Sequence, residues 1–306
     1  MRTLTRQELY DLVLFTLMTK LAESFGISDV GLAEICDRHR VPTPPRGYSR
    51  PFYAFDSMNP AVGCAYDALA DKNFTTQSDM IVGLRPIWTE PHYKNKASKF
   101  SQTTFKTMAF CGLTPDLLTF GENLSVDKLL SLTRRNRSKS PEAKYLLDEI
   151  LALRAIEKEA IDSLKSEVDN LAGAHFGQSF DIKSARRKGR LILRLHQARQ
   201  ERAIVYFGLP SLTYSETAAK IGALVIQDLK ATLASSTTQW LYVFDEFSVF
   251  ASAQVLNLVN MGRGYGGAAV LATQSFADFE SEGSKQLLRQ VATDTSPTSP
   301  WPWLAA

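Results

Sequence analysis

The amino-acid sequence predicts an α/β protein that combines an incomplete parallel sheet with an all-helical insertion and a small helical unit in front of both. Two strand-like apolar runs, 240–244 and 268–273, lie on either side of an amphipathic segment. A third run, at 202–207, is followed by a helical pattern at 217–233. Strands that alternate with helices in this way form parallel sheets with right-handed crossovers.

The composition is that of an ordinary globular chain, with 306 residues, 44% hydrophobic and 22% charged, and a net charge of +3. Because the net charge is small, nucleic-acid binding has to be judged from local basic patches. The cysteines, Cys36, Cys64 and Cys111, lie far apart and indicate reduced thiols rather than disulfides or a zinc site. No apolar run reaches the roughly 20 residues of a membrane-spanning helix, and no signal-peptide pattern is present, so we expect a cytoplasmic protein.

Residues 1–48 predict a small helix-turn-helix unit. Thr5 can cap a first helix, Gly26 provides a turn, and Ser28 can cap a second helix. Small or apolar residues stand where two crossing helices need contacts, namely Ala22, Ile27, Leu32 and Ile35. The alternative is a helical hairpin with no role in DNA binding.

The stretch from Met18 to Tyr48 resembles the helix-turn-helix of small bacterial DNA-binding proteins, in particular a family of short phage and mobile-element proteins. It departs from that family at Gly31 and Ser49. The candidate DNA-binding residues of this unit are Lys20, Ser28, Arg38 and Arg40. Asp29 and Glu34 oppose contacts with phosphates, which indicates a modest affinity.

The segment that follows begins the α/β part of the chain. A linker rich in proline and glycine, 42–51, cannot be helical, and we place a boundary near Ser49. After it, residues 52–56 predict a short strand and residues 58–60 a turn. The segment up to residue 112 then runs into a helix.

Residues 113–198 predict an all-helical insertion. Apolar residues recur at helical spacing with charges between them, which is typical of core-facing helices. Two basic runs stand out, at 134–139 and 186–190. Such runs usually form solvated surfaces. Because two of them occur in one helical module, a contact with nucleic acid is an equal alternative. The candidate residues for this contact are Arg186, Arg187 and Lys188.

Two acidic residues follow the strand-like run at 240–244. Asp245 and Glu246 stand at its carboxyl end, where parallel sheets place their ligands. In P-loop NTPases the first acid of such a pair holds Mg²⁺ through water, and the second polarises the attacking water. The run at 268–273 ends at Gln274, whose amide would lie at the same edge and sense a γ-phosphate. The alternative is that these acids are simply polar residues at a strand end, which are common in α/β domains.

From about residue 52 to 290 the chain resembles conjugative type IV coupling proteins of the TraD/TraG kind, which are ring-forming DNA-pumping ATPases of the RecA-like class. The matching segments are 55–60, 88–97, 205–209, 227–229, 243–247, 262–264 and 272–275. The resemblance implies that Asp245 and Glu246 form the Walker B pair, that Arg263 acts as an arginine finger on the nucleotide of a neighbouring subunit, and that Gln274 senses the phosphate. It also implies ATP and Mg²⁺ as cofactors, with Asp245 holding the Mg²⁺ through water.

Three features depart from that family. The chain has no Gly-x-x-x-x-Gly-Lys-Ser/Thr loop and no Gly-Lys pair, so the phosphates of a nucleotide lack their usual cradle. The membrane helices of the family, which place its full-length members at the inner membrane, are missing. From about Val291 the periodicity is lost, and we expect a disordered tail.

These observations divide the chain into five expected parts. They are a helix-turn-helix (1–48), the first part of a RecA-like core (49–112), an all-α insertion (113–198), the Walker B half of the core (199–290) and the tail (291–306). The insertion corresponds to the part that the family links to recognition of the DNA-processing complex.

The favoured hypothesis is a DNA-binding, truncated or rearranged coupling protein of a conjugative element, without ATP turnover of its own. Its expected partners are DNA, intact coupling-protein subunits and components of the relaxosome. One alternative is an active DNA-translocating ATPase with a non-standard phosphate loop. Another is a transcriptional regulator whose ATPase-like part serves only for oligomerisation or sensing.

Overall fold

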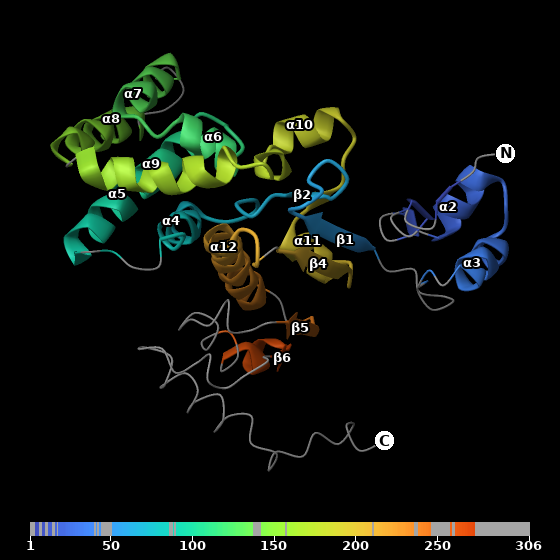
Figure 1. Cartoon of the computed structure of the whole chain (residues 1–306). Helices are drawn as coiled ribbons and strands as arrows, with labels where there is room; N and C mark the ends of the chain where they lie inside the picture. The colour runs from blue at the N-terminus through green and yellow to red at the C-terminus, as the bar shows by residue number, and fades with distance from the viewer. Residues whose placement is uncertain are drawn as a thin grey trace, which may run out of the picture. The chain divides into compact units, whose positions relative to one another are not determined.

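The computed structural model describes residues 4–5, 8–9, 12–13, 16, 18–39, 41, 43, 51–85, 88, 90–136, 142–156, 158–209, 211–235, 238–245, 258 and 261–272 (Figure 1). The chain forms two compact units. The first comprises 1–70, 116–118 and 169–209, and the second comprises 71–115, 119–168 and 210–306. The boundaries expected from the sequence at 49, 113, 199 and 291 stay predictions.

The amino-terminal helices share a small core of their own. Helix α2 (Met18–Phe25) and helix α3 (Asp29–Arg38) are joined by a turn in which Gly26 has φ +66°. A positive φ favours glycine at this position. The Ser28 hydroxyl caps α3 by accepting a hydrogen bond from the Gly31 N–H at 3.0 Å, as predicted. The buried core consists of Leu9, Val13, Leu21, Ala22, Leu32, Cys36 and Val41.

The remainder of the first unit is built on two parallel strand pairs. Strand β1 (Phe52–Asp56) pairs with β4 (Ile204–Gly208), and β2 (Ala65–Tyr66) pairs with β3 (Ile192–Leu193). The short helices η3 (Gly177–Ser179), α10 (Ile182–Arg187) and α11 (Leu195–Gln200) complete this unit. Ring centroids 5.2 to 6.3 Å apart join its aromatic core, which consists of Phe55, Tyr66, Phe180 and Phe207.

The middle of the chain is helical. Its elements are α4 (Phe74–Val82), α5 (Pro91–Phe110), α6 (Leu117–Glu122), α7 (Val126–Arg135), α8 (Glu142–Ala152), η2 (Leu153–Ala155) and α9 (Lys158–Ala172). In the second unit α5 contacts α4, α7 and α8. The described residues between 113 and 198 are mostly helical, and the sequence gave no sign of β3, which is only two residues long. That this range forms one insertion domain stays a prediction.

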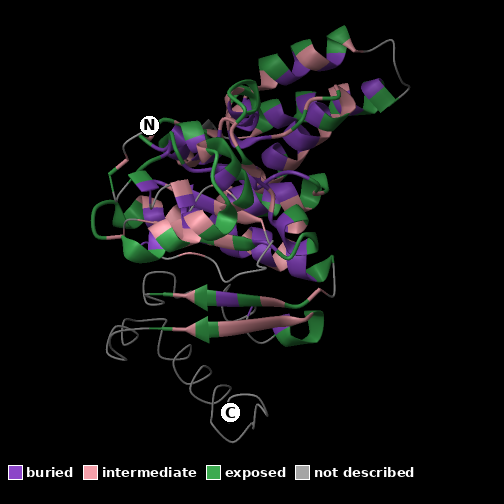
Figure 2. Cartoon of the chain, turned by 90° about the vertical axis from the view of Figure 1, so that its right-hand side faces the viewer, coloured by how far each residue is buried: buried purple, intermediate pink, exposed green. Residues whose placement is uncertain are grey.

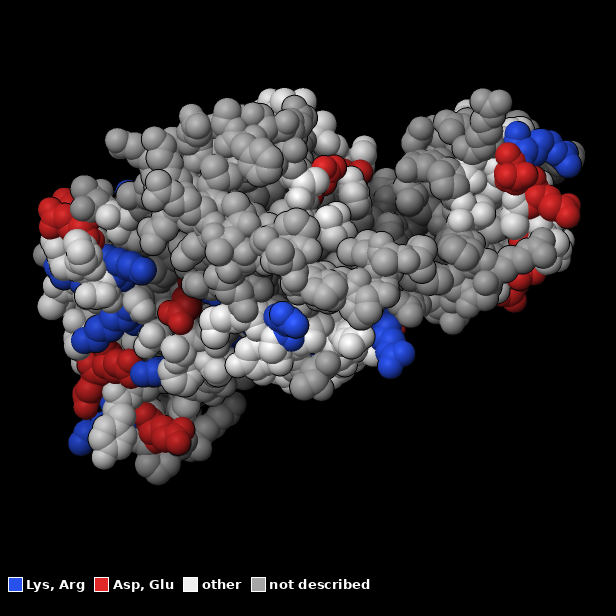
Figure 3. All heavy atoms as spheres, turned by 90° about the horizontal axis from the view of Figure 1, so that it is seen from below, with Lys and Arg blue, Asp and Glu red and all other residues white. Residues whose placement is uncertain are grey.

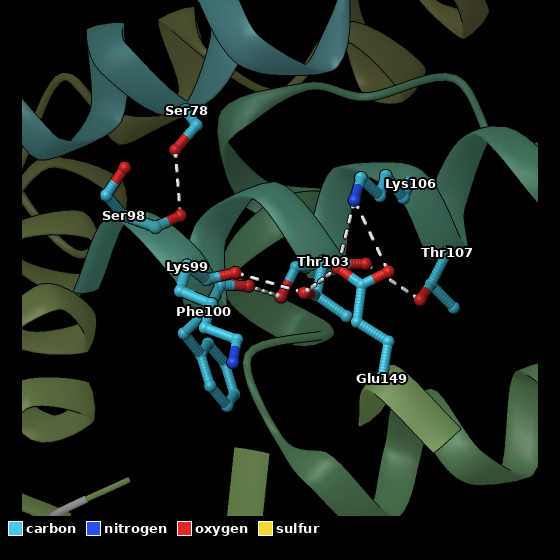
Figure 4. A network of polar contacts seen from close by, with 9 residues as sticks. Ser78, Ser98, Lys99, Phe100, Thr103, Lys106, Thr107 and Glu149 are labelled. Atoms are coloured by element: carbon cyan, nitrogen blue, oxygen red, sulfur yellow. Dashed lines mark hydrogen bonds and ion pairs between the residues drawn. The ribbon is translucent and has the colours of Figure 1, made fainter. Parts of the chain in front are cut away.

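Helix α5 is joined to α8 by a polar network, which Figure 4 shows. The Thr103 hydroxyl lies 3.0 Å from the Lys99 carbonyl oxygen of its own helix and 2.9 Å from Glu149 Oε1 of α8. Lys106 Nζ donates to the same Glu149 oxygen at 2.9 Å. Because Thr103 is fully buried, a polar side chain at this place needs such partners.

The second unit ends with a helix and a third parallel strand pair. Helix α12 (Ser215–Ala234) precedes β5 (Trp240–Phe244), and the short helix η5 (Arg263–Tyr265) leads into β6 (Gly267–Leu271). The register runs from Trp240 opposite Gly267 to Phe244 opposite Leu271. A Cβ on Gly267 would lie 2.9 Å from the Tyr242 ring and 3.2 Å from Leu233 of α12, so the close packing of strand on helix requires glycine there.

A buried ion pair fixes α12 to the segment before α4. Lys72 Nζ lies 2.7 Å from Asp228 Oδ1, and the Asp228 side chain is fully buried. A buried charge needs a partner of this kind, since an uncompensated charge in the interior is strongly destabilising.

The predicted α/β class with parallel strands and helical insertions is confirmed. A continuous apolar run such as 240–244 is typical of a strand that is covered on both faces. Leu241 and Val243 are instead 57% and 64% exposed, and only Tyr242 of this strand is buried (Figure 2). An apolar strand sequence marks the strand but not how many of its faces are covered. Within the described ranges the strands form three separate pairs.

Two further expectations bear on the class of protein. No helix in the described part of the chain combines the length and the apolar character needed to cross a membrane. The cysteines, all of which lie in the described part of the chain, form no disulfide bond with one another, and burial raises the pKa of the Cys64 thiol to about 12. A thiol with so high a pKa is unreactive at neutral pH.

Candidate functional site

The carboxyl ends of β5 and β6 lie at the same edge of their strand pair. The strands run parallel in Figure 2, and the Ala272 N–H extends the pairing by donating to the Phe244 carbonyl oxygen at 2.9 Å. Asp245 leaves β5 at this edge and is exposed. Glu246 and Gln274, which the sequence places beside it, lie outside the described residues.

An exposed carboxylate at a strand end suits a water-mediated contact with Mg²⁺ but does not by itself form a nucleotide site. The described part of the chain contains no group of three metal-ligating side chains. Two grooves in the described part of the chain are lined by other residues, one in α7 and α8 and one mainly in α9. The sequence also lacks a phosphate loop. The described residues therefore do not form a site that fits ATP and Mg²⁺.

Arg263 lies at the opposite edge of the same strand pair. It is the first residue of η5, which ends just before β6 starts at Gly267, and Gly267 pairs with Trp240, the first residue of β5. Five-residue strands rise by about 3.3 Å per residue, so the two edges are roughly 13 Å apart. Arg263 and Asp245 of one chain are therefore not brought together, and Arg263 is exposed in a loop where Gly266 has φ +78°.

The basic run at 186–190 divides into exposed and structural residues. Asp181 caps α10 by accepting a hydrogen bond from the Ser184 N–H at 2.8 Å. Arg186, Arg187 and Lys188, at the other end of this helix, are exposed. A cluster of exposed cations of this kind suits a phosphate backbone.

Arg190 has a different role. Its guanidinium donates to the carbonyl oxygens of Gly63 at 2.7 Å, of Gln178 at 3.3 Å and of Pro60. Burial lowers the pKa of Arg190 from its ordinary value. This arginine therefore holds the loop that follows β1, and its guanidinium is engaged by the protein itself.

The amino-terminal candidates are placed on the surface of the helix pair. Lys20 and Arg38 are exposed, whereas the Ser28 oxygen is occupied as the cap of α3, and Arg40 lies outside the described residues. Exposed carboxylates of α3 at Asp29, Glu34 and Asp37 outnumber Arg38 on that helix. In Figure 3 the helix pair shows more acidic than basic surface. On the described residues of this helix pair, these carboxylates oppose contacts with phosphates, as expected from the sequence for Asp29 and Glu34.

Sequence reasoning missed a charged pair at the edge of β2 and β3. Asp67 and Arg194 each follow a strand, and Arg194 Nε and Nη2 both lie 2.9 Å from Asp67 Oδ2. Burial raises the pKa of the Asp67 carboxyl, while Arg194 opposes this change. The Asp67 Oδ1 atom is buried and has no hydrogen-bond partner in the described part of the chain. The only signal in the sequence is a charge after each of two very short apolar runs, which is too weak to predict a pair.

Comparison with solved structures finds similarity to a conjugative coupling protein. The chain is similar to the bacterial conjugative coupling protein TrwBdeltaN70 in its unbound monoclinic form, with a TM-score of 0.51 and 11% sequence identity over 79% of this chain and 55% of that chain. The plasmid coupling protein TrwB in complex with the non-hydrolysable GTP analogue GDPNP gives a TM-score of 0.47 and 12% identity over 79% of this chain and 56% of that chain.

The first of these two matches, with its TM-score of 0.51, establishes a likeness of fold. The chain spans about half the length of the coupling protein it resembles. No protein-family model matches the sequence, and no curated protein sequence matches it. The RecA-like expectation is therefore supported at the level of a coupling-protein-like α/β fold.

Proposed function

We propose that this chain acts in conjugative DNA transfer as a DNA-binding relative of the coupling proteins that does not turn over ATP by itself. The observation that carries the proposal is the coupling-protein-like fold, which extends over 79% of the chain. The parallel pair β5–β6 supports the proposal, because Asp245, the expected first Walker B residue, directly follows β5 at the carboxyl edge of the pair.

The nucleotide part of the proposal rests on chemistry. Hydrolysis of ATP requires backbone N–H groups and a lysine that hold the β- and γ-phosphates, and the sequence contains no such loop. An acidic residue at a strand end can hold Mg²⁺ but cannot replace that cradle. We therefore propose that Asp245, Glu246 and Gln274 form an incomplete site, with low affinity for ATP and Mg²⁺.

The DNA part rests on the exposed end of α10. Arg186, Arg187 and Lys188 supply three adjacent cations, and Arg190 fixes the segment from which they project. We propose this cluster as the principal contact with the phosphate backbone. Lys20, Arg38 and Arg40 supply a second, weaker contact, because the carboxylates of α3 repel phosphates.

Two kinds of protein partner complete the proposal. Intact coupling-protein subunits would meet this chain through Arg263, whose place at the far edge from Asp245 suits a contact with a neighbour. Components of the relaxosome would meet the helical insertion at 113–198.

A transcriptional regulator is the second candidate function, and one observation favours it. The amino-terminal helix pair has its own buried core, as an independent DNA-binding unit would have. In a regulator DNA binding would depend on residues 1–48 and would be specific for one sequence. If the chain acts as a relative of the coupling proteins, DNA binding would depend on α10 and would tolerate different DNA sequences.

The test compares DNA binding of three charge-reversed variants with that of the original chain, namely a triple variant of α10, a triple control variant and Arg38→Glu. We expect Arg186→Glu, Arg187→Glu and Lys188→Glu together to weaken binding to a duplex of arbitrary sequence and to reduce the salt slope by about 0.9 for each lost contact. The control carries the same change of charge at three other exposed lysines, Lys94, Lys99 and Lys165, and should retain the salt slope. Equal loss in both variants would refute α10 as the contact, and loss only on Arg38→Glu would favour the regulator.

The second measurement is steady-state ATP hydrolysis of the whole chain with Mg²⁺. We expect no turnover above that of a Glu246→Gln control. Turnover that disappears in the control would contradict the proposal and restore the alternative of an active ATPase.

A further inference from the structure

An open groove runs between α7 and α8 in the second unit. Its volume is about 580 Å³, and it is lined by Leu130, Arg134, Lys144, Leu147, Asp148 and Leu151. The four lining residues of α8 are spaced at i, i+3, i+4 and i+7 and therefore lie on one face of that helix. The groove is thus a surface formed by facing stripes of two neighbouring helices.

The opposite face of α8 is fixed by the protein itself. Leu146 and Ile150 are buried, and Glu149 accepts hydrogen bonds from Thr103 and Lys106 of α5 (Figure 4). These contacts hold α8 in one rotation about its axis. They turn the lining residues outward, and Leu151 is 43% exposed on that side.

The floor and the rim of the groove differ in chemistry. Leucines from both helices form the floor, and cations occupy one end, where Arg134 stands in the last turn of α7 and Lys144 near the start of α8. Arg135 adds a third exposed cation at the same end. Asp148 is the single acid among the lining residues. An occupant that matches this surface has an apolar stripe and negative charges beside it.

We propose that the groove between α7 and α8 binds an acidic amphipathic helix of a protein partner. The helix would place leucine-like side chains at i, i+3 or i+4, and i+7 against Leu130, Leu147 and Leu151, and carboxylates against Arg134 and Lys144. A third helix laid into the groove between two helices is an established mode of peptide recognition. This inference rests on the part of the proposed function that assigns a protein partner to the insertion at 113–198, and it does not depend on the proposed DNA contact of α10.

Two other occupants fit the groove less well. Small-molecule sites are concave and contain a few convergent polar groups, whereas this groove is open and its charged groups stand at the rim. A nucleic-acid backbone would pair with the cations, but it would gain nothing from a floor of leucines, and Asp148 would repel it.

The probe for the experiment is a fluorescent synthetic peptide made of Leu, Glu and Ala, with leucines at helical spacing on one face and glutamates on its flanks. We expect the full chain to bind it in a fluorescence-anisotropy titration. The same peptide with lysine in place of glutamate should not bind. Because charge at a rim acts mainly on association and leucines in a floor act on dissociation, added salt should slow association more than it speeds dissociation.

Three variants locate the binding. Leu151→Ser removes an exposed part of the floor, and Arg134→Glu with Lys144→Glu reverses the rim, each without disturbing the buried face of α8. Both should weaken peptide binding by about ten-fold or more, as truncations at the centre of an interface do. Lys165→Glu, an exposed charge reversal on α9, should leave it within about two-fold.

The proposal fails if the chain does not bind the acidic peptide, or if the groove variants bind it as well as Lys165→Glu does. It also fails if duplex DNA displaces the peptide and the groove variants lose DNA affinity to the same extent, because the groove is then a nucleic-acid contact.

Discussion

At the scale of single residues, nearby cations of one basic run differ in exposure and in their contacts. Arg187 and Arg190 are three positions apart, yet the first is exposed and the second donates to three carbonyl oxygens. Gly189, with φ +65°, ends α10 between them and turns the chain so that Arg190 points inward. The consequence is that charge alone does not define the binding surface of this run.

Replacing Arg190 should therefore affect stability rather than DNA binding. Arg190→Ala leaves the Gly63 and Pro60 carbonyl oxygens without this donor, and we expect a loss of about 1–3 kcal/mol in the free energy of unfolding. Arg187→Ala, the matched control, should change it by no more than about 0.5 kcal/mol. Urea unfolding of both variants measures the difference. A fully stable Arg190→Ala chain with reduced DNA affinity would instead place Arg190 in the DNA contact.

Asp67 makes a prediction about pH. Its pKa in the folded chain is raised above the ordinary 3.8, mainly by burial and further by Asp116, against the opposing charges of Arg194 and Arg186. A raised carboxyl pKa means that the folded state binds the proton more tightly than the unfolded state does. The contribution to stability is therefore greatest below pH 3.8 and is lost as the pH rises through the folded-state pKa.

The Asp67→Asn variant tests this sign. The free energy of unfolding of the variant minus that of the original chain should increase as the pH rises from about 4 toward neutrality. Urea titrations at a series of pH values give this difference, and common effects of other acids cancel in it. A difference that falls over the same range would show that Arg194 outweighs burial.

At the scale of elements, the start of β6 lies close to Leu233, near the end of α12. Gly267 is the point of closest approach, since a Cβ there meets the Tyr242 ring and Leu233. We expect Gly267→Val to destabilise the chain by about 1–3 kcal/mol through overpacking. Ala268→Val, at the next position and across from the exposed Leu241, should be nearly neutral. Thermal unfolding of the two variants compares them, and equal melting temperatures would contradict the packing described for Gly267.

The elements also show what sequence can predict. Strand β5 was predicted from the apolar run at 240–244, most of β6 from the run at 268–273, and α12 from the amphipathic pattern at 217–233. The parallel pairing follows from the alternation of strand and helix. Strands β2 and β3 could not be predicted, because two residues carry no period. The exposure of Leu241 and Val243 and the burial of Arg190 depend on tertiary neighbours, which composition does not encode. For the same reason the sequence identified the acid at the edge of β5 but not the charged pair at the edge of β2 and β3.

At the scale of the whole molecule, the proposed partnership with intact coupling proteins predicts inhibition. A chain with a coupling-protein-like fold and no phosphate loop of its own can occupy a place in a ring without supplying a working nucleotide site. We expect ATP hydrolysis by an intact coupling protein to fall as this chain is added. Unchanged activity at excess, together with an absence of co-sedimentation, would exclude such mixed rings.

Because Asp245 and Arg263 lie at opposite edges of the pair β5–β6, they would face different neighbouring subunits in a ring. In the proposed mixed ring these two edges would be unequal, because the acidic edge would lack a phosphate loop whereas the other edge would keep Arg263. A ring that admits one such chain is then damaged on one side only, so each incorporated copy should silence its own site and spare that of its neighbour. Arg263→Ala would remove the contribution to the neighbour's nucleotide site as well. At the same concentration this variant should therefore inactivate about twice as many nucleotide sites in the ring as the original chain does, because Asp245 and Arg263 lie at opposite edges of the pair β5–β6 and would act on different sites.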